Sequence, residues 1–414
     1  MNKNRVIEEK KKFCYLYSIK KILFKNKKSS KLIVDIIKID SIGNNVKKEK
    51  VRNVGVDFTR IVSMYSIIVE HVLGHGRAII KFSKYKELIL INIIFFYCVS
   101  TYALISGYIG YKSNKYSNLL YLWFWTIFYT SSITFYLNRF RPEFKTGKVN
   151  YTNFFPVILG EYWYFTKYFG MYLFLPVINK GIAYLTQSEL RNVFMSLIFI
   201  YIIEKDIMNP REDPFKMSDG YSVVWFLICF IIGAYFGRFK HNYHGFHQFI
   251  FCILLLDLFY YSTYFCYCIS FYPKKNLNGY YKTKLIIIYL KQIFVSRVSS
   301  VPMILQSISV LLFLTQINYN KYLTKIITFI GPLTFGVYLI HEHKLIRAFI
   351  IRNLFAKDSN NLSLHSVIKL ILLRSLKIFA MSAFIDYLRH ILFTFLRIRK
   401  ICIFIEKIIF KQTG

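Results

Sequence analysis

The stretch from residue 89 to residue 109, ILINIIFFYCVSTYALISGYI, decides the fold class of this chain. It contains no charged side chain, and as a helix it is long enough to cross roughly 30 Å of hydrocarbon, which takes about 20 residues. A helix in the core of a soluble protein seldom runs so far without a charged face. The stretch therefore predicts a membrane-spanning helix. Comparable apolar runs follow at Leu119–Leu137, Val223–Phe239 and Phe249–Phe271.

The composition of the chain agrees with a membrane protein. Of its 414 residues, 55% are hydrophobic, and 56 Lys and Arg stand against 21 Asp and Glu, giving a net charge of +35. Such a chain is either a basic nucleic-acid binder or a polytopic membrane protein with basic loops. The cations lie between the apolar runs and form no single basic face, so we expect no nucleic-acid partner. Lys is abundant together with Asn, Ile and Tyr, which indicates codon bias and weakens the charge as evidence for an anionic partner.

We predict an all-α polytopic membrane protein with about ten transmembrane helices around a polar cavity. Residues 1–52 are expected to form a basic cytoplasmic arm, residues 53–400 the membrane domain and residues 401–414 a basic tail. The expected spans centre on Phe58–Leu73, Leu88–Tyr111, Tyr116–Leu137, Tyr162–Ile178, Val193–Ile207, Val223–Phe239, Phe249–Phe271, Val301–Ile317, Ile326–Ile340 and Leu370–Leu388.

The arm sets the expected orientation in the membrane. An even number of spans places both termini on one side, and the excess of Lys and Arg in residues 1–52 makes that side cytoplasmic by the positive-inside rule. We therefore expect a multi-pass protein of the plasma membrane. The arm itself either lies on anionic lipid as an amphipathic helix or is a plain extension.

The first expected span carries ionisable residues, which are costly inside a membrane and therefore indicate function. Arg60 and His71 are eleven residues apart, so on a helix they lie only about 20° apart around the axis and about 16 Å apart along it. They line one face at different depths. An arginine can hold a phosphate or carboxylate through its forked guanidinium. A histidine can take a proton from a nucleophile near neutral pH.

This Arg-x10-His spacing in the first of about ten spans resembles the acyltransferase-3 family of membrane O-acyltransferases. Asp57, three residues before Arg60, fits the Asp-x-x-Arg opening of that family. The resemblance covers roughly residues 53–400 in the order of the family. Its further landmarks are Leu104–Tyr108 with its Ser-Gly-Tyr ending, Tyr162–Phe165, Tyr172–Asn179, Gly331–His341 with its Tyr-Leu-x-His ending, and Asp386-Tyr-Leu-Arg389.

The resemblance implies an acyl-CoA donor bound from the cytoplasm and an acyl group, usually acetyl, that passes to a hydroxyl of a cell-surface glycan or glycolipid. His71 would be the general base on the acceptor hydroxyl, and Arg60 would position the anionic donor. Transfer could be direct or pass through an acyl-His71 intermediate. Where the family often carries Arg pairs after its second span, this chain has Lys112 and Lys115 as candidate donor-binding residues. Arg297 could join them or reach the membrane interface.

Four further residues could support the site, each with a structural alternative. Ser106 belongs to a Ser-Gly pair that allows close helix packing. Glu70 could join two helices or pair with Arg77. Trp163 could stack on a sugar or belong to the interfacial aromatic belt. His341 could face the acceptor or lie among lipid headgroups.

We predict no metal site, because a His71 and His75 pair lacks a third ligand in its own stretch of sequence, and the cluster of His241, His244 and His247 is interpreted as a solvated loop. The cysteines form no CxxC pair and indicate no disulfide framework. The expected partners are the lipid bilayer and a glycan or glycolipid acceptor, while the oligomeric state stays open. Two other interpretations remain: a transporter or flippase for a polysaccharide intermediate, and an inactive relative of the acyltransferases.

Overall fold

The computed structural model describes residues 52–113, 115–141, 154–204, 213, 215–239 and 298–409. These residues form helices and connecting turns, and no strand occurs among them. A boundary between Arg52 and Asn53 divides the chain into two units, and all that follows concerns the second. The predicted all-α class is confirmed for this part of the chain.

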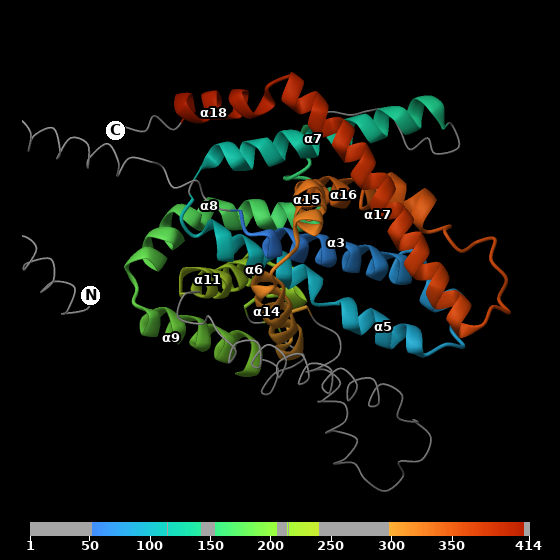
Figure 1. Ribbon diagram of the computed structural model, residues 1–414, viewed down its shortest axis with the longest axis horizontal. Helices are drawn as coiled ribbons and strands as arrows, with labels where there is room; N and C mark the ends of the chain where they lie inside the picture. The colour runs from blue at the N-terminus through green and yellow to red at the C-terminus, as the bar shows by residue number, and fades with distance from the viewer. Residues whose placement is uncertain are drawn as a thin grey trace, which may run out of the picture. The chain divides into compact units, whose positions relative to one another are not determined.

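Figure 1 shows the helices of the described residues. They are α3 (Val54–Gly74), α4 (Ala78–Lys81), α5 (Glu87–Phe95), α6 (Cys98–Gly110), α7 (Tyr116–Phe140), α8 (Trp163–Tyr184), α9 (Gln187–Ile198), the π-helix η3 (Phe199–Glu204), the 3-10 helix η4 (Ser218–Gly220), α11 (Val223–Phe239), α14 (Val301–Gln316), α15 (Lys321–Ile330), the 3-10 helix η6 (Gly331–Leu333), α16 (Thr334–His341), the π-helix η7 (Ile346–Ile351), α17 (Leu364–Phe395) and α18 (Ile398–Ile409).

Most expected spans coincide with helices, but three of them are not single α-helices. The span predicted at Val193–Ile207 passes from α9 into the π-helix η3 at Phe199. The span predicted at Leu88–Tyr111 is divided into α5 and α6 at residues 96–97. The span predicted at Ile326–Ile340 is divided by η6, which contains Pro332, a residue that cannot donate a backbone hydrogen bond. Helix α11 has the predicted bounds. The run Phe249–Phe271 lies outside the described residues.

The number of spans is not confirmed. Within the described part, two helical stretches are long and apolar enough to cross a membrane, Glu87–Gly110 and Lys321–His341, and two shorter apolar helices cover Val223–Phe239 and Met303–Gln316. Helix α17 adds a row of large apolar side chains that are exposed, as expected of a surface that faces lipid. These are Leu373, Leu376, Phe384, Leu388, Ile391 and Phe395.

The C-terminal helix crosses the boundary that we predicted at residue 400. Helix α18 extends to Ile409 and packs against α7 (red and teal in Figure 1). Residues 401–409 of the predicted tail therefore continue a helix that begins at Ile398.

Helix α3 is the element on which the candidate site is built. Its first turn is capped by the Asn53 side chain, which accepts the Val56 backbone N–H at 3.3 Å, and Asp57 places a negative charge near the positive end of the helix dipole. The helix contacts α6, α14, α15, α16 and α17. Segments from both ends of the described chain therefore meet around its sides.

Helices α6 and α11 cross at backbone contact distance. A Cβ added to Gly107 would lie 1.9 Å from the Phe230 carbonyl oxygen, and one added to Gly233 would lie 2.0 Å from the Leu104 carbonyl oxygen. Gly237, one turn after Gly233, is equally close to Tyr108. This Gly-x3-Gly spacing is typical of helices that associate within membranes, where small residues allow two backbones to approach. The crossing fixes the position of α6, and with it the position of Ser106, which directly precedes Gly107.

The crossing generates a stability prediction. In Gly233→Ala the new methyl group has no space, so the helices have to separate, and overpacking of this kind destabilises by about 1–3 kcal/mol. The thermal unfolding midpoint of the detergent-solubilised protein should fall by several degrees. Gly181→Ala on α8 is the control, because nothing lies within 4 Å of its added Cβ and alanine is the better helix former. Equal midpoints for the two variants would contradict the crossing.

Candidate functional site

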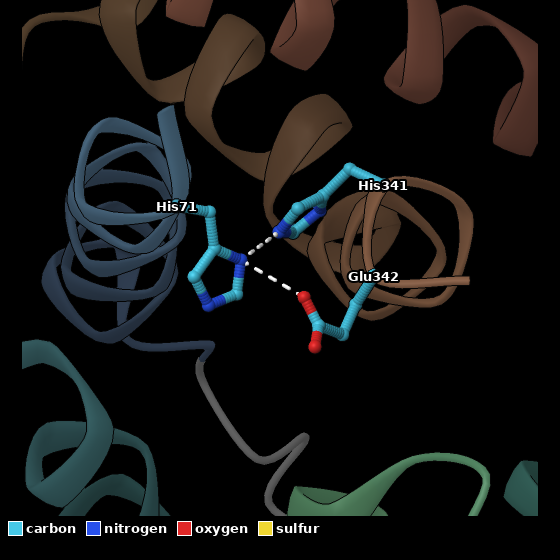
Figure 2. A group of neighbouring side chains, drawn as sticks. All are labelled: His71, His341 and Glu342. Carbon is cyan, nitrogen blue, oxygen red and sulfur yellow. Dashed lines mark hydrogen bonds and ion pairs between the residues drawn. The ribbon is translucent and has the colours of Figure 1, made fainter. Parts of the chain in front are cut away.

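Three side chains converge where α3 and α16 end (Figure 2). His71 lies in the last turn of α3, His341 is the last residue of α16, and Glu342 caps α16. His71 Nδ1 is 3.1 Å from His341 Nε2 and 3.1 Å from Glu342 Oε2. Residues 270 positions apart in the sequence therefore share one polar cluster.

The hydrogen bonds of His341 assign the proton positions of the neutral rings. Its Nδ1 lies 2.6 Å from the Val337 carbonyl oxygen, which can only accept, so this nitrogen carries the proton. His341 Nε2 then has a lone pair and accepts from His71 Nδ1. In this arrangement His71 Nε2 keeps its lone pair, and no hydrogen bond from a described residue reaches it. His71 Nε2 is therefore the basic nitrogen of the cluster.

Burial separates the cluster from bulk water while leaving one opening. The His341 residue is 1% exposed and the Glu342 side chain 3%, but 14% of the His71 side chain remains accessible. Glu342 Oε1 forms an ion pair with Arg347 Nη1 at 2.5 Å, and Arg347 is partly exposed. Glu342 Oε2 is buried and makes no hydrogen bond within the described structure. His71 is thus the most accessible side chain of the three.

His343 shows what a structural histidine looks like in the same region. Burial lowers its pKa to about 4, so its ring is neutral. Its Nδ1 accepts the Leu345 backbone N–H at 3.3 Å, and its Nε2 lies 3.5 Å from Thr134 Oγ1. Both ring nitrogens of His343 contact protein groups, whereas for His71 only Nδ1 has such a contact among the described residues.

Arg60 lies toward the opposite end of α3. Its Nη1 donates to Asp57 Oδ1 at 2.7 Å, and Tyr102 donates from its hydroxyl to the Arg60 carbonyl at 2.7 Å. Asp57 is 1% exposed, whereas 28% of the Arg60 side chain is accessible. Asp57 packs against Gly331, which leaves space because it has no side chain: a Cβ added to Gly331 would lie 2.7 Å from the Asp57 Cβ. The Asp-x-x-Arg motif therefore forms a charged pair whose cation faces outward.

Three other predicted supporting residues make the following contacts with residues outside the cluster. Glu70 Oε2 accepts from the Cys98 thiol of α6 at 3.8 Å, consistent with its expected role between helices. Ser106 donates to the Tyr102 carbonyl of its own helix at 3.0 Å. Trp163 packs its ring 4.6 Å from that of Tyr221.

Two other predicted donor-binding residues, Lys112 and Lys115, lie outside α3, the helix that carries Arg60 and His71. Lys112 follows α6, where its ammonium lies over the Tyr111 ring, and Lys115 precedes α7, where its carbonyl accepts from the Tyr172 hydroxyl at 2.8 Å. Arg297 lies outside the described residues. A cavity of about 480 Å³ includes Lys112 in its lining. Its lining residues are Tyr111, Lys112, Asn179, Lys180, Ala183 and Arg238.

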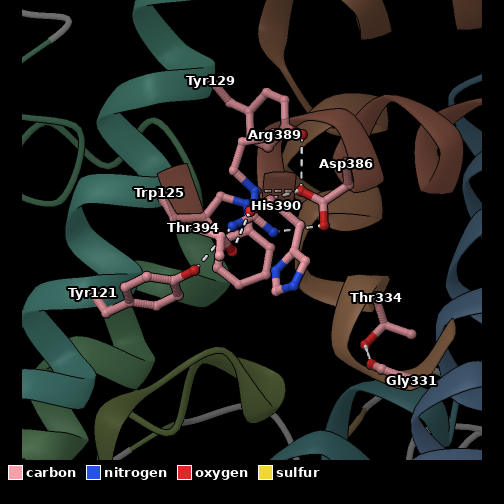
Figure 3. A network of polar contacts seen from close by, with 9 residues as sticks. All are labelled: Tyr121, Trp125, Tyr129, Gly331, Thr334, Asp386, Arg389, His390 and Thr394. Atoms are coloured by element: carbon pink, nitrogen blue, oxygen red, sulfur yellow. Dashed lines mark hydrogen bonds and ion pairs between the residues drawn. The ribbon is translucent and has the colours of Figure 1, made fainter. Parts of the chain in front are cut away.

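A buried ion pair on α17 is hydrogen-bonded to side chains of α7 (Figure 3). Arg389 donates through Nε and Nη2 to the two oxygens of Asp386, each at 2.9 Å. Asp386 Oδ1 also accepts from Trp125 Nε1 at 3.1 Å and from the Tyr129 hydroxyl at 2.8 Å. Arg389 Nη1 reaches the Tyr121 hydroxyl at 3.1 Å. Each of these five side chains has a hydrogen-bond partner within the network, which is the condition for a buried polar network to stabilise a fold.

The network also determines where α16 lies. Gly336 of α16 faces Asp386 so closely that a Cβ would lie 1.9 Å from Oδ1. Gly336 comes five residues before His341 on the same helix. The position of His341 opposite His71 therefore depends on the carboxylate of Asp386.

Sequence reasoning missed Glu342 and the structural role of the Asp386 pair. Glu342 follows a landmark histidine at the end of an apolar run, and a lone carboxylate there is the signal that could have identified it. Asp386 and Arg389 have opposite charges three residues apart in an apolar segment, a spacing that predicts an ion pair on one helix face.

Comparison with known proteins assigns the chain to a class. A family model described as an acyltransferase domain matches residues 53–390. The chain belongs to the acyltransferase-3 family, which confirms the resemblance found in its sequence. Membership implies an acyltransferase that is associated with a membrane. No curated protein and no solved structure matches the chain.

The Asp386 network generates the second stability prediction. Asp386→Ala leaves the guanidinium of Arg389, which is 3% exposed, without its counter-charge, and breaking a buried pair in this way destabilises by about 3–5 kcal/mol. The yield of folded, monodisperse protein and its unfolding midpoint should both fall.

Glu161→Gln is the matched control for Asp386→Ala. It removes a carboxylate whose partner Lys344 is 53% exposed, and exposed pairs contribute at most about 1 kcal/mol. If both variants unfold at the same temperature, the network does not support the fold as argued.

Proposed function

We propose that this protein is a membrane O-acyltransferase that transfers an acyl group from acyl-CoA to a hydroxyl of a cell-surface glycan or glycolipid, with acetyl as the expected group. Membership of the acyltransferase-3 family supports the reaction class. The observation that supports His71 as the base is the hydrogen-bond chain from His71 through His341 to the Val337 carbonyl. It orients the His71 ring and leaves its Nε2 lone pair available.

The proposed reaction uses this lone pair. His71 Nε2 takes the proton of the acceptor hydroxyl while the hydroxyl oxygen attacks the thioester carbonyl carbon. The bond from carbon to sulfur breaks, and the departing thiolate receives the proton from the His71 imidazolium. The positive charge on His71 that forms in between is stabilised by the carboxylate of Glu342, 3.1 Å from Nδ1.

Arg60 is proposed to bind the anionic part of the donor. Asp57 engages one of its Nη1 hydrogens, and the planar guanidinium has further N–H donors for a phosphate oxygen. The axial rise between Arg60 and His71, about 16 Å, suits a long donor whose charged end and reactive thioester are far apart.

His71→Gln should reduce the rate of acyl transfer by at least about 100-fold, because a positioned general base contributes roughly 10²- to 10⁴-fold. Release of the CoA thiol and the mass of the acylated acceptor are measured on purified protein with acetyl-CoA and a glycan acceptor.

His365→Gln, an exposed histidine of α17, is the control and should transfer at the wild-type rate. Undiminished transfer by a folded His71→Gln protein would exclude His71 as the base. Movement of a labelled glycan precursor across vesicles without acyl-CoA would favour a transporter.

Arg60→Lys keeps the charge beside Asp57 but loses the forked donor geometry. The KM for acyl-CoA should rise about tenfold, which corresponds to about 1.4 kcal/mol, while kcat changes little. Steady-state kinetics with varied donor concentration measure this. A fall in kcat at unchanged KM would instead place Arg60 at the reacting atoms.

A further inference from the structure

In the cluster of His71, His341 and Glu342, hydrogen-bond acceptors outnumber hydrogen-bond donors. His341 Nε2 and Glu342 Oε2 each lie 3.1 Å from His71 Nδ1, and Nδ1 carries a single proton. That proton can satisfy one acceptor. The other acceptor, Glu342 Oε2, is buried and makes no hydrogen bond to a described residue. A buried oxygen without a hydrogen bond is costly, and a bound cation would give it a partner.

The geometry resembles the ligand arrangement of a tetrahedral metal ion. Ligands that lie about 2.0–2.1 Å from Zn²⁺ are about 3.3 Å from one another at the corners of a tetrahedron. The two distances from His71 Nδ1 are 3.1 Å, and the three donor atoms all lie within 4.8 Å of one another. The third edge, between His341 Nε2 and Glu342 Oε2, lies within the same 4.8 Å limit.

The surroundings orient these ligands as the outer shell of a metal site does. The Val337 carbonyl accepts from His341 Nδ1 and directs the Nε2 lone pair into the cluster (Figure 2). Arg347 holds Glu342 Oε1 at 2.5 Å and leaves Oε2 facing the histidines. The His71 ring, which is partly accessible, provides the approach for an ion.

We propose that His71, His341 and Glu342 bind one Zn²⁺ ion, and that the bound ion inhibits acyl transfer. Two imidazoles and a carboxylate suit Zn²⁺, whereas Mg²⁺ requires an octahedral set of oxygens. When Nδ1 of His71 coordinates the ion, the proton of the neutral ring resides on Nε2. That nitrogen then has no lone pair for the acceptor hydroxyl. The inhibition rests on the proposed role of His71, but the binding does not.

Counting bound ions tests the site directly. The full-length protein in lipid nanodiscs is stripped with a chelator, exchanged into buffer with Zn²⁺, and analysed for metal per chain. Wild type and the control His365→Gln should each retain one more ion than Glu342→Gln or His71→Gln. Equal metal content in all four proteins would overturn the site, and so would equal retention of Mg²⁺ and Zn²⁺ by wild type.

A spectroscopic measurement covers the case in which a variant folds poorly. Co²⁺ added to the stripped wild type should give the strong visible absorption of a four-coordinate ion with nitrogen ligands, and Zn²⁺ should displace it. The weak absorption of six-coordinate Co²⁺ would contradict the proposed geometry. This measurement needs no substitution.

Kinetics test the inhibition. The stripped protein should be active, and the rate should fall about tenfold at a Zn²⁺ concentration about nine times the dissociation constant measured by metal content. A chelator should restore it. A rate that Zn²⁺ leaves unchanged or raises would overturn the inhibition. If the stripped protein binds Zn²⁺ but never transfers an acyl group, the proposed function fails and the metal site stands.

Discussion

The buried carboxylate of Asp386 is the constraint on which the arrangement of the site depends. It is fully buried, and it accepts hydrogen bonds from two helices while the Arg389 guanidinium balances its charge. Such a group is tolerated only when every lone pair has a partner, so the helices that supply the donors cannot move independently. Gly336 brings α16 against this carboxylate and so places His341 beside α3. Residues without contact to the cluster thereby determine its geometry.

The sequence predicts the local helices well, because the length of an apolar run in the sequence determines the length of a helix in an apolar environment. The bounds of α11 and the start of α7 follow from where apolar residues begin and end. The interruption at Pro332 could have been predicted from the missing backbone donor. The break at residues 96–97 could not, since nothing in that run of apolar residues opposes a continuous helix and the packing around it decides.

The site is harder to predict because it joins distant parts of the chain. Spacing alone identifies the shared face of Arg60 and His71, and a family landmark identifies His341. That the two histidines meet depends on how α3 and α16 pack, and no periodicity encodes a contact over 270 positions. Glu342 was overlooked since a carboxylate at a helix end is ordinarily solvated. Here it is buried and ion-paired with Arg347.

The glycine crossing of α6 and α11 affects how the molecule can move. Where side chains separate two helices, the helices can slide as rotamers exchange, but here the carbonyls of one backbone lie against the Cα atoms of the other. Sliding along this contact would push a carbonyl oxygen of one helix into a Cα atom of the other, so the two helices move as one rigid unit. A displacement of α6 would therefore displace α11 with it, and the interruption between α5 and α6 marks where the helical stretch before this contact ends.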